Sequence, residues 1–277
     1  MDPKGTLYVV GTPIGNLDDI TVRAIQTLKT VSRIVSEKPA TTKKLLNRYE
    51  IVTPLSAYHE HLCGSNWERV IVWIEKGDSI ALVSEAGMPC IEDPGVELVN
   101  QCRNKNIPVV VIPGPSALIT ALISSGFPNS TFTFYGFLPK KQTERMRILQ
   151  TIRDSANAAI LYESPHRLMN SLKEMTTVIN NRQIAVCREM TKFYEEVLRG
   201  TPEEIIKRFQ TSPLKGEATI VVSSGTAAKQ PDLLNDQEIS KKISGLIRKG
   251  LSRSEAAKEV ATQLGIPKKK AYVLAHI

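Results

Sequence analysis

The sequence has few of the features that mark membrane, secreted or metal-binding proteins. No apolar run approaches the roughly 20 residues that a helix needs to cross a bilayer, and the first residues lead directly into a strand-like run without a signal-peptide pattern. The four cysteines (Cys63, Cys90, Cys102 and Cys187) lie far apart, with neither CxxC nor Cys/His metal spacing. We therefore expect a cytoplasmic protein with reduced thiols, no membrane partner and no bound metal.

The common nucleotide-binding signatures are also missing. The first apolar run, residues 7–10, leads into GTPIGNL at residues 11–17, which matches neither GxGxxG nor a P-loop. Two histidines, His59 and His61, flank Glu60, but no other cluster of metal-ligating residues is visible in the sequence. A metal site there is conceivable. A surface or substrate-facing loop is the favoured interpretation.

Negative charge is scarce towards the C-terminus. The chain has a net charge of +8, and residues 236–277 carry nine Lys or Arg against four Asp or Glu, a surplus of five. A concentrated basic segment indicates a polyanionic partner such as nucleic acid. The alternative is a solvated tail, which charge alone does not exclude.

Glycine and proline are concentrated in loops that follow predicted strands. Apolar runs at residues 80–83 and 108–112 lead into loops at 84–95 and 113–117, and a helical pattern follows each. Glycine lets the backbone approach a ligand closely, and proline removes a backbone hydrogen-bond donor. Each loop alone could be an ordinary turn. Three such loops after neighbouring parallel strands would share one rim, where α/β sheets bind their ligands.

The strand–helix alternation restarts beyond residue 126, with strands predicted at 131–135, 158–162, 183–187 and 218–222. We therefore expect an α/β fold with two α/β domains and parallel sheets. A polar segment then precedes three short helices, the second of which begins with a capping-box pattern at Ser252 and Glu255. The predicted organisation is an N-terminal α/β domain at 1–114, a second α/β domain at 115–225, a linker at 226–235 and a basic helical domain at 236–277.

Six loop motifs occur in order along the chain: GTPIGNL at 11–17, AGxP at 86–89, DPG at 93–95, PGPSA at 113–117, YESPHR at 162–167 and RExTK at 188–192. Taken together, they resemble the motifs of the tetrapyrrole-methylase-like superfamily, and within it those of the bacterial 16S rRNA (cytidine-2′-O)-methyltransferases. The first loop is closer to these rRNA enzymes than to tetrapyrrole or diphthine enzymes, whose loop usually reads GxGPGD. The resemblance covers essentially all of the chain.

This resemblance implies a class III methyltransferase fold with S-adenosylmethionine held in a cleft between the two α/β domains. It also implies a homodimer that methylates the ribose of a decoding-centre cytidine in 16S rRNA or the small ribosomal subunit. By position, the resemblance places the cofactor against Pro13, Ser84, Gly87, Met88, Pro89, Ile91, Ser116, Ala117, Tyr162, Met190 and Ala218.

The chain departs from the family pattern at three places. Glu37 is followed by Lys38-Pro39-Ala40 where the family usually has Asp-Thr-Arg, and Glu85 and Met88 replace a usual aspartate and threonine. Two other readings therefore stay open: a related small-molecule methylase of the tetrapyrrole type, and an RNA- or ribosome-binding module whose catalytic site has decayed.

Methyl transfer to a ribose hydroxyl needs a base or a cation near the nucleophile. Four residues that follow strand ends in the second domain are candidates for this role: Glu163, His166, Glu189 and Lys192. Each could instead belong to a structural ion pair. Basic side chains suited to RNA phosphates are Lys140, Lys141, Arg145, Lys268, Lys269 and Lys270.

Overall fold

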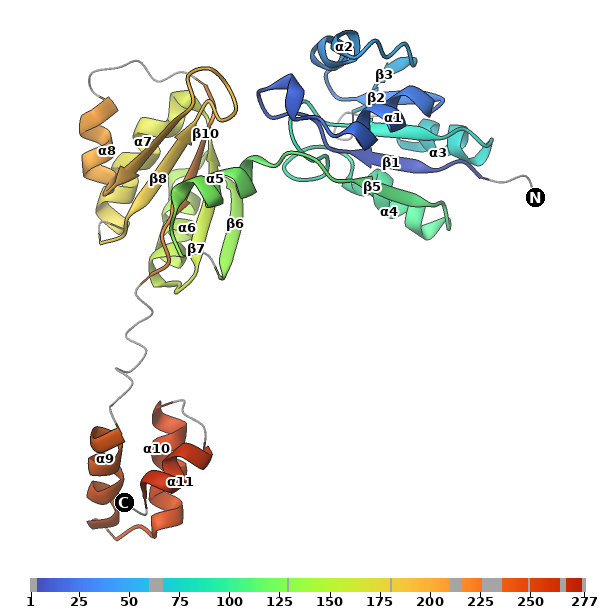
Figure 1. The fold of residues 1–277 in the computed structure, drawn as a ribbon. Coiled ribbons are helices and arrows are strands. Elements are labelled where there is room, and N and C mark those ends of the chain that lie inside the picture. Colours follow the sequence, from blue (N-terminus) through green and yellow to red (C-terminus); the bar gives the residue numbers. More distant parts are fainter. Residues whose placement is uncertain are drawn as a thin grey trace. The chain divides into compact units, whose positions relative to one another are not determined.

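A computed structural model describes the chain as two compact units, Met1–Ser224 and Gly225–Ile277 (Figure 1). The residues described are 4–59, 67–128, 130–179, 181–209, 216–225, 236–248, 250–264 and 268–275. The predicted linker at 226–235 lies outside these ranges. None of the helices in the described ranges is long and apolar enough to cross a membrane.

The first sheet has five parallel strands in the order β3-β2-β4-β1-β5. Alternate residues of its buried strands pack into two separate hydrophobic cores, one on each face of the sheet. Ile80 and Leu82 belong to one core, and Ala81 and Val83 belong to the other. Helices α3 and α4 supply the first core, and α1 and α2 the second. The sheet is therefore covered on both faces, as predicted from its continuous apolar runs. Its elements are β1 (Leu7–Val10), α1 (Val22–Thr30), β2 (Arg33–Ser36), α2 (Pro39–Arg48), β3 (Leu55–Ala57), α3 (Trp67–Glu75), β4 (Ile80–Val83), α4 (Val96–Asn104) and β5 (Val109–Ile112).

The second sheet differs from the prediction of an all-parallel sheet. Its order is β6-β7-β10-β8-β9, and only β6 and β7 run parallel. Strand β9 is not predicted from the sequence. It pairs with β8 as a hairpin, and a hairpin connection forces an antiparallel pair. Its strands are β6 (Phe132–Phe137), β7 (Ala158–Glu163), β8 (Ile184–Arg188), β9 (Glu196–Gly200) and β10 (Ala218–Val222).

Helices cover both faces of the second sheet as well. One face packs on α6 (Gln142–Asp154), α7 (Pro165–Val178) and α8 (Pro202–Phe209), which share its larger core. The other face packs on α5 (Ala117–Ser125), through Ala121 and Leu122. Since α5 directly follows β5, the loop between them connects the first sheet to the core of the second.

The C-terminal unit is a three-helix cluster formed by α9 (Asp236–Arg248), α10 (Arg253–Leu264) and α11 (Lys268–Leu274). The predicted capping box is present at the start of α10: the Ser252 amide donates to Glu255 Oε2 at 3.0 Å, and the Glu255 amide donates to Ser252 Oγ at 3.3 Å. Small residues of α10, including Ala256 and Ala257, are fully buried against the other helices.

Candidate active site

The three glycine- and proline-rich loops meet at one edge of the first sheet. Strands β4, β1 and β5 are parallel neighbours, so their carboxyl ends lie together. Thr12 and Gly87 exchange backbone hydrogen bonds of 2.8 and 3.0 Å, which join the first loop to the second. A Cβ on Gly11 would lie 2.8 Å from the Cα of Gly114, so the first and third loops touch only because both residues are glycine. The prediction of a shared rim is confirmed.

A hairpin from the second sheet closes this rim. The Asn16 amide donates to Thr191 Oγ1 at 2.9 Å. A Cβ on Gly15 would lie 2.6 Å from that same Oγ1, so the first loop and the β8–β9 loop are in direct contact. This contact brings Glu189, Met190 and Lys192 to the loops of the first sheet.

Together these segments enclose a cavity of about 600 Å³. That volume lies in the range of small-molecule and cofactor sites. Nine of the eleven residues predicted to contact the cofactor line it. They are Pro13, Gly87, Met88, Ile91, Ser116, Ala117, Tyr162, Met190 and Ala218.

The other two predicted cofactor residues, Ser84 and Pro89, do not line this cavity. The Ser84 hydroxyl is buried and donates to the Gly87 carbonyl at 3.1 Å. It therefore stabilises the conformation of the loop without facing the cavity. Further lining residues were not predicted from the sequence, and those outside the three loops reach the cavity only through the strand order. These are Ile14, Gly15, Leu17, Lys38, Thr41, Glu85, Ala86, Glu92, Asp93, Phe137, Gly216, Glu217 and Thr219.

The cavity carries more carboxylates than amines. Its ionisable lining consists of five acids and two lysines: Glu85, Glu92, Asp93, Glu189, Glu217, Lys38 and Lys192. Lys38 forms an ion pair with Glu85, and Lys192 Nζ lies 3.0 Å from Glu189 Oε1. Burial, reinforced by the charges of Glu37, Glu85 and Glu217, raises the pKa of Asp93 to about 6. Such a site favours a cationic ligand, which would relieve the repulsion among its acids.

An aromatic group forms another part of the wall. The rings of Phe134 and Phe137 meet the Tyr162 ring edge-on, with centroids 5.0 and 5.5 Å away. Burial raises the pKa of Tyr162 to about 12, so its phenol stays protonated at neutral pH and presents a hydroxyl rather than a charge.

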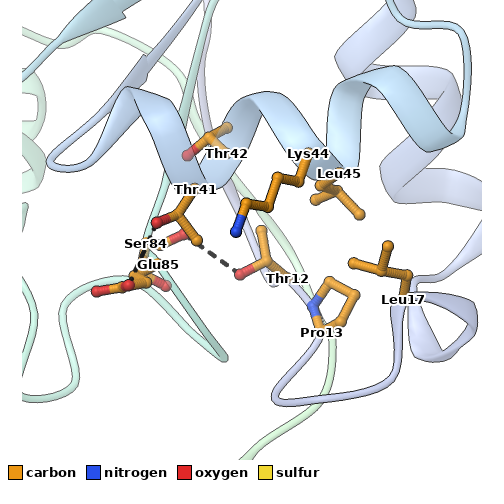
Figure 2. Close-up of a pocket in the computed structure, with 9 residues that line it drawn as sticks. All are labelled: Thr12, Pro13, Leu17, Thr41, Thr42, Lys44, Leu45, Ser84 and Glu85. Carbon is orange, nitrogen blue, oxygen red and sulfur yellow. Dashed lines mark hydrogen bonds between the residues drawn. The ribbon is translucent and has the colours of Figure 1, made fainter.

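A smaller pocket of about 270 Å³ adjoins the cavity, between α2 and the loops after β1 and β4 (Figure 2). It shares four lining residues with the cavity, Pro13, Leu17, Thr41 and Glu85. Thr41 donates to Glu85 Oε1 at 3.3 Å, and Figure 2 shows the Lys44 side chain extending over the pocket. Because α2 begins at Pro39, the unusual Lys38-Pro39-Ala40 segment lies where this helix meets the cavity.

The four candidate catalytic residues separate into two groups. Glu189 and Lys192 line the cavity, whereas Glu163 and His166 do not. The Glu163 carboxylate is fully buried and accepts hydrogen bonds from Ser171 Oγ at 2.5 Å and the Ser164 amide at 2.9 Å. These contacts tie β7 to α7. His166 is exposed at the start of α7.

The predicted phosphate-binding residues are also in different environments. Arg145 is only 14% exposed and forms a double hydrogen bond with Glu174 at 2.7 and 2.8 Å, which joins α6 to α7. Lys140 and Lys141 are exposed. Lys268, Lys269 and Lys270 form the first turn of α11, but their side chains lie outside the described part of the structure. No group of three or more metal-ligating side chains occurs among the residues that the structure describes.

Comparison with known proteins identifies the class. A family model described as tetrapyrrole (corrin/porphyrin) methylases matches residues 6–206. A solved structure of cobalt precorrin-4 methyltransferase, a cobalamin biosynthetic enzyme, superposes with a TM-score of 0.61 at 15% identity, covering 79% of this chain and 94% of that one. The chain therefore belongs to the tetrapyrrole methylase family.

Within that family, its near full-length relatives carry the name ribosomal RNA small subunit methyltransferase I. The protein of that name from Halalkalibacterium halodurans is 44% identical over 277 residues, which cover 99% of this chain and 96% of the relative. The one from Thermotoga maritima is 42% identical over 219 residues, which cover 79% of this chain and 98% of the relative. The family resemblance drawn from the loop motifs is confirmed.

Proposed function

We propose that the chain is an S-adenosylmethionine-dependent methyltransferase that acts on the 2′-hydroxyl of a decoding-centre cytidine in 16S rRNA. The observation that carries this proposal is the acid-rich cavity, built from the motifs that resemble those of the rRNA enzymes. The names of these relatives support an rRNA substrate. Such a substrate places the protein in the cytoplasm.

The residues of the cavity fit a sulfonium cofactor. The surplus of carboxylates favours a ligand that carries positive charge. Gly87 adopts a positive φ of 78° and leaves room where a Cβ would project towards Ile14 and Pro115. We assign the cofactor to the loops around Pro13, Gly87 and Ser116, with Tyr162, Met190 and Ala218 closing the site from the second sheet. Met88 supplies a thioether where the family usually has a hydroxyl.

The bound cofactor would supply an electrophilic methyl group. The chain must align a ribose hydroxyl with it and manage the hydroxyl proton. Glu189 and Lys192 are the candidates, because they line the cavity and already share a hydrogen bond of 3.0 Å. In this arrangement Glu189 accepts the proton and the Lys192 ammonium stabilises the developing alkoxide. Glu163 and His166 are left out of this assignment because of their placement.

The two alternative functions rest on different observations. A tetrapyrrole methylase is the function named for a structural neighbour, but at 15% identity that likeness concerns the fold alone. A decayed RNA-binding module is suggested by Lys38-Pro39-Ala40. Against decay, Lys38 forms an ion pair with Glu85 across the cavity wall, so the substitution leaves a coherent site.

We also propose a homodimer, supported by exposed apolar residues beside the site. Val110 and Val111 belong to the edge strand β5 and are 40% and 52% exposed. Ile119 and Ile123 lie one turn apart on α5 and are 42% and 68% exposed. Such residues are typical of an interface between subunits. Ile123→Glu is expected to convert the dimer to a monomer in light scattering.

The proposed function is tested with two measurements on the same protein. Titration calorimetry with S-adenosylmethionine is expected to show binding, and its absence would favour the decayed module. Mass spectrometry of 16S rRNA from cells that lack the protein is expected to show one missing 2′-O-methylcytidine, restored by the wild-type gene and not by Glu189→Gln. Cofactor binding with a fully methylated 16S rRNA would favour a small-molecule methylase instead.

A further inference from the structure

The loop between β8 and β9 carries two aromatic residues with almost no cover. Phe193 is 94% exposed and Tyr194 is 78% exposed, and their rings meet edge-on with centroids 5.0 Å apart. They occupy the two central positions of a turn closed by a hydrogen bond from the Glu195 amide to the Lys192 carbonyl at 3.1 Å. Those positions usually hold small or polar residues. Two adjacent exposed rings at a turn tip are therefore a candidate binding surface.

The turn is held in a defined position. The Thr191 amide donates to Glu195 Oε2 at 2.9 Å, and Thr191 Oγ1 accepts from the Asn16 amide of the first loop. Glu189 and Thr191 adopt positive φ values of 48° and 65°, which non-glycine residues adopt rarely. A turn fixed at both ends presents its rings with little entropy left to lose on binding.

The ring of Phe193 lines an open groove of about 620 Å³. The groove shares the lining residues Gly15, Leu17 and Lys192 with the acid-rich cavity, so the two adjoin. Its floor and walls are Gly15, Asn16, Leu17, Asp18, Arg48, Thr191, Lys192 and Phe193.

The two cations of this groove have carboxylate partners of different exposure: Asp18 is 67% exposed and Glu189 only 22%. Arg48 lies 3.1 Å from Asp18, and Lys192 lies 3.0 Å from Glu189. An exposed pair such as Arg48–Asp18 contributes little stability, so a phosphate can replace the Asp18 carboxylate at small cost. Flat rings beside a cation that can accept a phosphate are the combination that binds single-stranded nucleic acid, where bases stack and the backbone is neutralised.

We infer that Phe193 and Tyr194 form a stacking platform for an unpaired RNA base next to the target nucleotide. Arg48 would hold the phosphate that connects the two nucleotides, while Lys192 faces the target ribose. This inference rests on the proposed function and adds to it the residues that hold the RNA strand at the mouth of the cavity. A neighbouring base fixed on the platform would leave the target ribose directed into the cavity.

The test uses the full-length protein and a short single-stranded RNA that carries 2-aminopurine, whose fluorescence is quenched by stacking. Phe193→Ala with Tyr194→Ala is expected to weaken RNA binding about 10-fold or more and to abolish the quenching. Phe193→Trp is expected to retain both, whereas Phe193→Leu, which is apolar but not flat, is expected to lose the quenching. Val52→Ala is the matched control, because Val52 is 96% exposed and lies outside the groove.

Two further measurements separate the platform from the proposed function. Cofactor affinity by calorimetry is expected to be unchanged in the double variant, while KM for small ribosomal subunits rises. Wild-type RNA affinity in the double variant, with normal methylation by the wild-type protein, would overturn the platform and leave the proposed function intact. Loss of dimerisation in the double variant would also overturn it, because the rings would then contact a second copy. Absence of methylation and of RNA binding in the wild-type protein would overturn both.

Discussion

Asp93 makes the cavity sensitive to pH. Its carboxyl lies among other acids, and burial together with Glu37, Glu85 and Glu217 raises its pKa to about 6. An acid with a raised pKa in the folded state stabilises the fold below its unfolded value, and that stabilisation is lost as pH rises through about 6. The ionised form of Asp93 is therefore destabilised in the empty site, and a bound cation would stabilise it.

Asp93→Asn is expected to remove the pH dependence of cofactor binding and the loss of stability at neutral pH. In the wild-type protein, S-adenosylmethionine should bind more tightly as pH rises from about 5 to about 7, by a factor of about 3 to 10. The variant should lack this step, and it should gain thermal stability over the wild type at neutral pH but not near pH 4. Calorimetry and thermal melts across this range measure the two effects. The ligand's own amino group titrates equally in both proteins, so the difference curve isolates Asp93.

Glu163 and His166 both belong to the YESPHR motif but differ in their surroundings: Glu163 is buried and His166 is exposed. Removing the Glu163 carboxylate leaves Ser171 and the Ser164 amide without their acceptor in a fully buried place. Glu163→Ala is expected to lower the free energy of unfolding by about 2 to 3 kcal/mol, and His166→Ala by less than about 0.5 kcal/mol.

Denaturant unfolding measures this difference, and methylation per folded molecule is expected to remain in both variants at a temperature where they are folded. A stable Glu163→Ala protein with no methyl transfer would instead return Glu163 to the catalytic residues.

At the scale of elements, the loops were predictable and their partners were not. Glycine and proline after apolar runs are local signals, and the parallel first sheet brings all three loops to one edge. By contrast, Asp93 and Glu217 belong to different sheets, and their approach depends on strand order and on the β8–β9 hairpin. No local pattern in the sequence encodes that order. The short strand β9 was missed for the same reason, since it is stabilised by pairing with β8.

The contact between the first and third loops tests how the rim is built. A Cβ on Gly114 would lie 2.9 Å from the Gly11 backbone. Because the atoms on both sides of this contact are backbone, neither loop can move aside without a change in its conformation. Gly114→Ala is expected to cost about 1 to 3 kcal/mol of stability and to weaken cofactor binding, because the loops would separate. Gly245→Ala in α9 is the control: nothing lies within 4 Å of its added Cβ, so a gain of up to about 1 kcal/mol is expected. Equal cofactor affinity in Gly114→Ala and wild type would show that the contact does not shape the site.

At the scale of the whole molecule, we expect the first unit and the C-terminal unit to have separable roles. The relative from Thermotoga maritima matches 79% of this chain while being covered over 98% of its own length. That share is close to the share of the first unit, Met1–Ser224. The three-helix unit has its own core and carries the basic surplus, so we expect it to add affinity for RNA phosphates rather than chemistry.

Removing residues 225–277 is expected to leave cofactor affinity within about twofold of the full chain, since each unit is compact by itself. RNA binding should weaken, and the slope of log affinity against log salt concentration should become shallower by about two units or more, because each lost phosphate contact removes close to one unit. Lys241→Gln with Lys242→Gln in the full chain changes two exposed side chains of α9 without removing a helix, and should reproduce part of the slope change. A truncated protein with the salt slope and KM of the full chain would mean that the basic helices do not contact the RNA and that the methylase unit alone recognises its substrate.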